Sequence, residues 1–216
     1  MEENTMQHGK LIVIDGMDGS GKGTQIKFLQ EKLKERGVIF TREPGGTPKA
    51  EEIRKLLLSG ENKSTPLADF LLFWASRAIH IEQTIIPALG SGMHVISDRF
   101  DSATYAFQIC GEKRPELLDS FLYCRSSIME KVVPDAYIFL DLPAKVAFDR
   151  RNKDAQQEKS RFDLKPIAYH NRVRRGFATF PPKGAVSSAV HIVDSNRPPE
   201  EVFNEILKIV QKELGF

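Results

Sequence analysis

The sequence predicts one α/β domain built on a parallel five-stranded sheet with helices on both faces. Short apolar runs alternate with longer helical patterns along the 216 residues, and this order is typical of parallel sheets whose strands are connected by helices. A glycine-rich segment joins the first run to the first helical pattern. The length suits one domain with a sizeable core, and no linker, repeat or low-complexity segment divides the chain. We therefore expect residues 1–216 to form a single domain.

Five apolar runs have the length and composition of buried strands. They cover residues 10–15, 38–41, 94–97, 136–140 and 190–193. The run at 136–140 (AYIFL) is strongly β-prone, whereas the run at 38–41 is the weaker prediction.

Helical patterns occupy the segments between these runs. They cover residues 22–36, 51–59, 67–89, 115–131, 145–151, 166–178 and 200–214. In the first of them Ile26, Leu29 and Leu33 fall on one face, and Gly37 follows as a stop signal. Residues 152–165 are polar, which favours a mobile surface loop, part of a short lid at about residues 150–165, over a domain boundary.

The composition excludes several classes of partner and location. A net charge of +2 is too small to indicate nucleic acid or an anionic membrane as a partner. No apolar run approaches the roughly 20 residues of a membrane span, and the N-terminus lacks the apolar region of a signal peptide. Cys110 and Cys124 have no Cys or His neighbours at metal-ligand spacing, while a disulfide between them stays open. We expect a soluble, cytoplasmic protein.

Residues 16–22 (GMDGSGK) have the composition and position of a phosphate-binding loop. Glycines let the backbone fold back so that successive N–H groups face one anion. The following helix adds partial positive charge at its N-terminus, and Lys22 is placed to reach the outer phosphates of ATP. An ordinary glycine-rich turn is the alternative, which does not explain a lysine in this register. The predicted ATP-binding residues here are Gly16, Gly19, Ser20, Gly21, Lys22, Gly23 and Thr24.

Position 23 departs from the usual pattern, in which a Ser or Thr follows the lysine and ligates Mg²⁺. Gly23 has no hydroxyl, and Thr24 comes one residue later. The ion is then left to nucleotide oxygens, water and a carboxylate, with Thr24 as the alternative hydroxyl. Asp98, directly after the strand at 94–97, is the predicted metal carboxylate. A surface ion pair between Asp98 and Arg99 is the competing interpretation.

Beyond the loop, the chain resembles thymidylate kinases, which are P-loop nucleoside monophosphate kinases, over nearly its whole length. The most specific match is TREPGGT at residues 41–47, which is similar to the bacterial form of the family. FLLFWASR at 70–77, the Asp-Arg-Phe triplet at 98–100 and PDAYIFLDLPAKVAFDRR at 134–151 match as well. GKGTQ at 21–25 is also similar to adenylate kinases, so the loop alone does not choose the substrate.

The resemblance implies a binding site for the nucleoside of dTMP. Asp18 would accept a hydrogen bond from the 3′-hydroxyl, Phe73 would stack on thymine and Arg77 would donate to its O4 carbonyl. Phe107 would crowd a ribose 2′-hydroxyl. Without the resemblance, Phe73 and Phe107 are more simply core residues, whereas Arg77 on an apolar helix needs an anion or a polar partner.

The resemblance also implies contacts around the sugar and the phosphates. Arg42 and Arg99 would hold the dTMP phosphate, although Arg42 taken alone equally fits a solvated strand end. Thr104 and Gln108 lie in the segment that would line the base and sugar. Asp194 lies where the family passes the adenine ring of ATP.

The phosphate-binding loop contains no arginine, so the positive charge that stabilises the transition state is expected to come from elsewhere in the chain. Members of the family carry basic residues for this purpose either in the loop or in the lid. The lid at about residues 150–165 contains several basic side chains, of which we favour Arg150 and Arg161. A basic loop that is merely solvated is the alternative.

Together these features predict transfer of a phosphoryl group from ATP to dTMP with Mg²⁺, giving dTDP for dTTP synthesis and DNA replication. The predicted catalytic residues are Asp18, Lys22, Arg99, Arg150 and Arg161. No general base is required, because the acceptor phosphate has a second pKa of about 6. The resemblance further implies a homodimer, with the apolar helix at 67–89 as the candidate interface.

Two other functions stay open. The GKGTQ segment fits another nucleoside monophosphate kinase, against which stand the 41–47 motif and the pair of Phe73 and Arg77. A non-catalytic P-loop protein that only binds ATP is favoured by Gly23 alone. A deoxynucleoside kinase is disfavoured, because its hydroxyl acceptor would need a carboxylate base.

Overall fold

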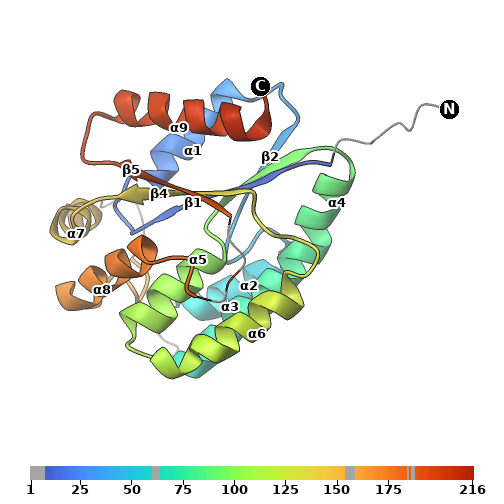
Figure 1. The fold of residues 1–216 in the computed structure, drawn as a ribbon. Helices are drawn as coiled ribbons and strands as arrows, with labels where there is room; N and C mark the ends of the chain where they lie inside the picture. The colour runs from blue at the N-terminus through green and yellow to red at the C-terminus, as the bar shows by residue number, and fades with distance from the viewer. Residues whose placement is uncertain (1–7, 60–63, 154–158, 184, 186–187) are drawn as a thin grey trace.

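Five parallel strands form the sheet that the sequence predicts (Figure 1). The structure, a computed structural model, describes residues 8–59, 64–153, 159–183, 185 and 188–216. The strand order is β2-β3-β1-β4-β5. The strands are β1 (Leu11–Gly16), β2 (Val38–Arg42), β3 (His94–Asp98), β4 (Ala136–Asp141) and β5 (Ala189–Asp194). The predicted strand ranges are confirmed to within one residue at either end.

Helices cover both faces of this sheet (Figure 1). On one face lie α1 (Lys22–Lys32) and α9 (Pro199–Leu214). On the other lie α2 (Pro48–Leu58), α3 (Pro66–His80), α4 (Ile86–Gly90), α5 (Asp101–Thr104), α6 (Leu118–Ile128) and α8 (Ile167–Ala178). Helix α7 (Ala144–Lys153) follows β4 and packs against α8. Three irregular segments complete the chain: η1 (Ile81–Ile85), η2 (Tyr105–Gly111) and η3 (Pro115–Leu117).

Strand β1 shows why the sequence is apolar without interruption at the centre of the sheet. Leu11 and Val13 join the core on the α3 face, whereas Ile12 and Ile14 join the core beneath α1 and α9. Successive side chains of a strand point to opposite faces, and both faces here are covered. All six residues of β1 are buried.

Several predicted helix boundaries were wrong. The helix predicted at 115–131 is a 3₁₀ turn followed by an α-helix that ends at Ile128, and two other differences have a local reason. The first helix ends at Lys32 rather than at residue 36, because Leu33 leaves the helical conformation. The second begins at Pro48, three residues earlier than predicted. The hydroxyl of Thr47 accepts a hydrogen bond from the N–H of Ala50 at 3.2 Å, and proline at the first helical position has no N–H to satisfy.

The long helical pattern at 67–89 is not one α-helix. Helix α3 begins at Pro66 after a Thr65 cap, and the π-helical η1 separates α3 from α4. Pro87 lies just after this wider turn, and a proline cannot donate a backbone hydrogen bond to the preceding turn.

The helical segment formed by α5 and η2, at residues 101–111, was not predicted. Periodicity identifies a helix by an apolar stripe beside a polar face. This segment is buried around most of its circumference and its buried residues include polar ones such as Asp101, Thr104 and Gln108. Its position directly after β3 places it beneath the phosphate-binding loop.

Cys110 and Cys124 are free thiols, so the open question of a disulfide between them is answered in the negative. Within the described ranges, no helix is long and apolar enough to cross a membrane.

Helix α8 packs on η2 through Gly176, and this contact makes a stability prediction. An alanine Cβ at position 176 would lie 2.7 Å from Cα of Ala106. Helix propensity favours alanine over glycine by about 0.5–1 kcal/mol, but overpacking against backbone costs about 1–3 kcal/mol. We expect Gly176→Ala to lower the free energy of unfolding, measured by urea titration. Gly90→Ala is the control, since its Cβ meets nothing within 4 Å; equal effects of the two variants would contradict the packing argument.

Candidate active site

A crevice of about 540 Å³ opens at the carboxyl end of the central strands. Its walls come from the loop after β1, the ends of β2 and β3, the helices α3, η2 and α7, and residues 160–163. In open α/β sheets this edge is the usual place for ligands. A second hollow of about 690 Å³ lies against α8 and β4 and shares only Met17 with the phosphate-binding loop. The first crevice contains the phosphate-binding loop, and Asp18, Lys22 and Arg99, whose pKa values are shifted, line it together, so it is the candidate active site.

The loop between β1 and α1 has the backbone geometry of an anion cradle. Gly16, Gly19 and Gly21 have φ angles of 144°, 82° and 92°, which only glycine adopts without strain. The ammonium of Lys22 donates to the carbonyls of Gly16 and Met17 at 3.0 and 3.2 Å. Desolvation, reinforced by Arg99, lowers the pKa of Lys22. An arriving phosphate would favour the charged lysine again.

Arg99 ties this loop to β3 through two carboxylates. Its guanidinium donates to Asp15 and to Asp18, both at 2.8 Å, and to the carbonyl of Gly16 at 3.0 Å. Its backbone is left-handed at φ 71°, and the hydroxyl of Ser97 donates to its carbonyl at 2.7 Å. Although desolvation opposes the charge, Asp18 and Asp15 raise the pKa of Arg99.

The two carboxylates differ in their environment. Asp15 is fully buried, and desolvation raises its pKa despite the nearby Arg99, Lys22 and the hydroxyl of Ser102. Asp18 is half-buried at the crevice wall. Desolvation opposes its ionisation as well, but Arg99 and then Lys22 lower its pKa to about 2. Asp18 is therefore a carboxylate at neutral pH and can accept a hydrogen bond from a substrate hydroxyl.

Asp98 and Thr24 both line the crevice beside Lys22. One carboxylate oxygen of Asp98 is buried and has no hydrogen-bond partner in the described part of the chain. Gly23 has no side chain and so adds no ligand atom beyond its backbone. Within the same described part, no group of three or more acidic, His or Cys side chains surrounds a common point. One carboxylate oxygen and one hydroxyl fit Mg²⁺, which keeps several waters and is held largely by substrate phosphates.

The arginines that line the crevice are not limited to those predicted. Arg42, at the end of β2, is exposed and pairs with Glu51 at 3.1 Å. Arg54 on α2 also lines the crevice and donates to the carbonyl of Pro44 at 2.8 Å. Arg54 was not among the predicted site residues. Its signal was its position one helical turn from Ala50-Glu51, on the helix that follows the 41–47 motif.

The opposite wall is aromatic. Phe73 of α3 lines the crevice and packs against Phe162, with ring centroids 6.1 Å apart. Phe107 of η2 lines it beneath the guanidinium of Arg99, which lies 4.8 Å from the ring centroid. Gln108 lines it too, and its side-chain N–H group is buried without a partner among the described residues. These three predicted residues thus share one wall.

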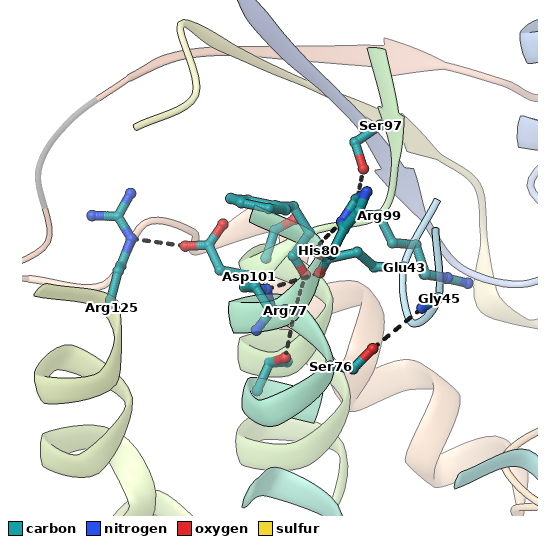
Figure 2. Close-up of polar contacts among 12 residues, drawn as sticks. Glu43, Gly45, Ser76, Arg77, His80, Ser97, Arg99, Asp101 and Arg125 are labelled. Atoms are coloured by element: carbon teal, nitrogen blue, oxygen red, sulfur yellow. Dashed lines mark hydrogen bonds and ion pairs between the residues drawn. The ribbon is translucent and has the colours of Figure 1, made fainter. Parts of the chain in front are cut away.

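Arg77 and Thr104 lie behind this wall and do not line the crevice. The Arg77 side chain is only 1% exposed. It donates to Glu43 at 2.8 Å, to the carbonyl of Phe100 at 2.8 Å and to the hydroxyl of Thr104 at 3.1 Å (Figure 2). The structure thus gives Thr104 a partner in Arg77, and substrate contacts for these two residues stay predictions.

The two favoured lid arginines are placed differently. Arg150 lines the crevice and donates weakly to the carbonyl of Ser195 at 3.4 Å. Arg161 points to α2 and α3, where it binds the carbonyl of Leu57 and the carboxylate of Asp69. It does not line the crevice.

Arg151, which sequence reasoning did not favour, does line the crevice and pairs with Asp163 at 3.0 Å. Residues 154–158 of the predicted lid lie outside the described residues. Asp194, the last residue of β5, is exposed and does not line the crevice. Its carboxylate accepts a hydrogen bond from the N–H of Asn196 at 2.9 Å.

The pairing of Arg99 makes a second stability prediction. Arg99→Met leaves Asp15 buried without its main counter-charge, and breaking a buried pair costs about 3–5 kcal/mol. Arg42→Met is the matched control, because its exposed pair with Glu51 is worth less than about 1 kcal/mol. A buried Asp with a raised pKa binds its proton more tightly in the folded state than in the unfolded state. Lowering the pH should therefore reduce the loss of free energy of unfolding that Arg99→Met causes. Urea titrations at pH 5 and pH 8 measure this; a deficit that widens at pH 5 would refute it.

Comparisons with known proteins agree with this geometry. The family model for thymidylate kinase matches residues 14–206. A thymidylate kinase of Neisseria gonorrhoeae (strain NCCP11945) is 36% identical over 212 residues, or 95% of this chain and 98% of that protein. One of Carboxydothermus hydrogenoformans is 38% identical over 201 residues, or 92% and 95%. The crystal structure of thymidylate kinase from Ehrlichia chaffeensis has a TM-score of 0.75 at 28% identity, covering 94% of this chain and 100% of that one. Full-length similarity, a matching fold and a phosphate-binding crevice at the expected edge of the sheet together place this chain in the thymidylate kinase family.

Proposed function

We propose that this protein phosphorylates dTMP to dTDP with ATP. The observation that carries the proposal is one crevice with two complementary ends. One end is the glycine cradle with Lys22, which suits the phosphates of ATP. The other combines Arg42, Arg54 and Arg99 with the ring of Phe73, which suits a monophosphate attached to a flat base.

The chemistry follows from the charges. Donor and acceptor are both anions, so the barrier is lowered mainly by positioning and by neutralising charge. Lys22 binds the ATP phosphates while Arg42, Arg54 and Arg99 bind the acceptor phosphate. The acceptor oxygen is already ionised at neutral pH, because its second pKa is about 6. No residue therefore has to remove a proton from the nucleophile.

Asp98 and Thr24 are the residues that would hold Mg²⁺, directly or through its waters. When bound, the ion supplies positive charge between the donor phosphates. The unpartnered buried oxygen of Asp98 supports this assignment, since such an atom is costly unless something binds it.

The nucleoside of dTMP is proposed to lie against the aromatic wall. Phe73 stacks on thymine, Phe107 leaves no room for a ribose 2′-hydroxyl, and the ionised Asp18 accepts from the 3′-hydroxyl. Gln108 has a free amide N–H group for the base or sugar. Asp194 is proposed to border the adenine of ATP beyond the crevice, on the loop whose Ser195 carbonyl contacts Arg150.

We further propose a cytoplasmic homodimer. Leu67 and Leu71, one turn apart on α3, are 46% and 53% exposed. Tyr123 of α6 is 72% exposed. Exposed apolar side chains on neighbouring helices support an interface on this side of the molecule.

The alternatives make different predictions for purified protein with Mg-ATP. We expect kcat/KM to be highest for dTMP among dTMP, dUMP, UMP, AMP and CMP, with no turnover of thymidine, measured as ADP release. Arg77→Ala should lower kcat/KM for dTMP about 10- to 100-fold, as for loss of a hydrogen bond from a charged donor. Turnover with AMP or CMP alone would indicate another monophosphate kinase. ATP binding with no turnover would indicate a non-catalytic protein.

The two lid arginines can be ranked by the same assay. Arg150→Met should lower kcat about 100-fold if Arg150 neutralises transition-state charge. Arg161→Met should chiefly lower the melting temperature, because it loses the pair with Asp69. Lys153→Met is the control for removing a nearby exposed cation. Equal losses of kcat in the Arg150 and Arg161 variants, without a change in melting temperature, would contradict this ranking.

A further inference from the structure

A connected chain of polar side chains lies beside the crevice, and Arg77 is the member of it that contacts the substrate in the proposed function. It runs from Thr41 on β2 through His80 and Glu43 to Arg77 (Figure 2 labels the last three). Glu43, Arg77 and His80 have side chains exposed by 3%, 1% and 0%. Replacing a buried ion pair by apolar residues is often neutral or stabilising. Stability alone is therefore a weak reason for this arrangement.

The contacts around Arg77 leave it a single orientation. Nε donates to Glu43, and one terminal nitrogen donates to Phe100 and Thr104. The guanidinium also lies 4.5 Å from the ring centroid of Trp74. Its other terminal nitrogen, Nη1, is buried and has no partner among the residues described. The other nitrogens of the Arg77 guanidinium are thus held by protein acceptors, and Nη1 is left to donate to a ligand.

The contacts of Glu43 are equally complete. Oε2 accepts from Arg77 at 2.8 Å, and Oε1 accepts from Nδ1 of His80 at 2.9 Å. Since a carboxylate only accepts, Nδ1 carries the proton, and Nε2 of a neutral ring accepts from the hydroxyl of Thr41 at 2.7 Å. Both oxygens of Glu43 are therefore occupied within the protein.

The glycines of the 41–47 motif allow this packing. A Cβ on Gly46 would lie 2.6 Å from the ring of His80, and the Gly46 backbone is left-handed at φ 84°. The N–H of Gly45 donates to the hydroxyl of Ser76 at 3.3 Å (Figure 2). The motif is thereby docked on α3 through the residue before Arg77 and the residue one turn after it.

We propose that Glu43, held by His80, is the positioning residue for Arg77 and through it sets the preference for a pyrimidine with a carbonyl at ring position 4. A donor held in place favours a carbonyl there over the amino group of a cytosine base, which itself donates. This inference rests on the proposed function, in which Arg77 binds the base.

The test is a double-mutant cycle on Glu43→Gln and Arg77→Ala, with dTMP and dCMP as acceptors. Glutamine has no charge and only one acceptor oxygen, so the ion pair with Arg77 is lost even where His80 changes tautomer to accept from the amide N–H. Glu43→Gln should raise KM for dTMP about 10- to 100-fold and lower the ratio of kcat/KM for dTMP over dCMP. KM for ATP should stay within about twofold. Adding Glu43→Gln to Arg77→Ala should change KM for dTMP little further, because a positioning residue acts only through its partner.

A purely structural role is distinguished by Asp101→Asn. Asp101 is a buried carboxylate that pairs with Arg125 at 2.7 Å, away from the crevice (Figure 2). This variant should lose stability but keep KM and the dTMP preference. If Glu43→Gln does not fold, His80→Leu takes its place, with His80→Asn expected to rescue because its amide can still donate to Glu43.

The outcomes separate this inference from the function on which it rests. If Arg77→Ala alters the preference and Glu43→Gln does not, positioning by Glu43 is refuted and the proposed function stands. If the two effects on KM add fully, Glu43 acts on its own and the inference is likewise refuted. If Arg77→Ala leaves the dTMP preference intact, base binding by Arg77 is wrong and the inference falls with it.

Discussion

The contact on which the site depends is the ion pair between Arg99 and the buried Asp15. Asp15 is the last residue but one of β1 and Arg99 follows β3, so the pair joins two adjacent strands at the edge of the sheet where the crevice lies. The same guanidinium reaches Asp18 and the Gly16 carbonyl. Losing Arg99 would therefore leave a buried carboxylate uncompensated and also release the phosphate-binding loop from β3. This explains a left-handed backbone at a residue other than glycine, a conformation that persists only where its surroundings enforce it.

The crevice gathers more positive charge than the net charge of the chain indicates. Three of its cations are paired with carboxylates of the protein: Arg42 with Glu51, Arg99 with Asp15 and Asp18, and Arg151 with Asp163. Among the described residues, the hydrogen bonds of the Lys22 ammonium go to carbonyl oxygens. The crevice therefore contains two kinds of cation. Some are held in place by carboxylates, and Lys22 is available to an arriving phosphate. Preorganised charge of this kind lowers barriers to phosphoryl transfer without reorganisation at the moment of reaction.

Helix α3 serves the crevice and the core at once. Phe73 faces the crevice, whereas Phe70, one turn earlier, and Trp74, the next residue, belong to the core. Arg77 and His80, one and two turns further, are buried and connect to the motif after β2. Helix α3 therefore connects the aromatic wall to the 41–47 segment, and a movement of one would displace the other.

The sequence by itself determined the strands, their parallel arrangement and the phosphate-binding loop. These depend on local patterns: apolar runs of strand length, glycines, and a lysine in register. The resemblance to the family added Phe73, Phe107, Gln108 and Arg150 as candidates, and the tertiary structure brings them to one crevice with the loop. The helical segment at 101–111 escaped prediction because it is buried nearly all round, which removes the periodic polar face.

Only the tertiary structure decided which charges are paired. Arg77 lies behind the crevice wall and Arg161 binds Asp69, whereas Arg54 and Arg151 join the crevice. Partners such as Glu43 and Arg77 are 34 residues apart in the chain, and no local pattern connects them. Which arginine is free and which is held depends on distances across the fold, because electrostatic and hydrogen-bond energies fall steeply with separation.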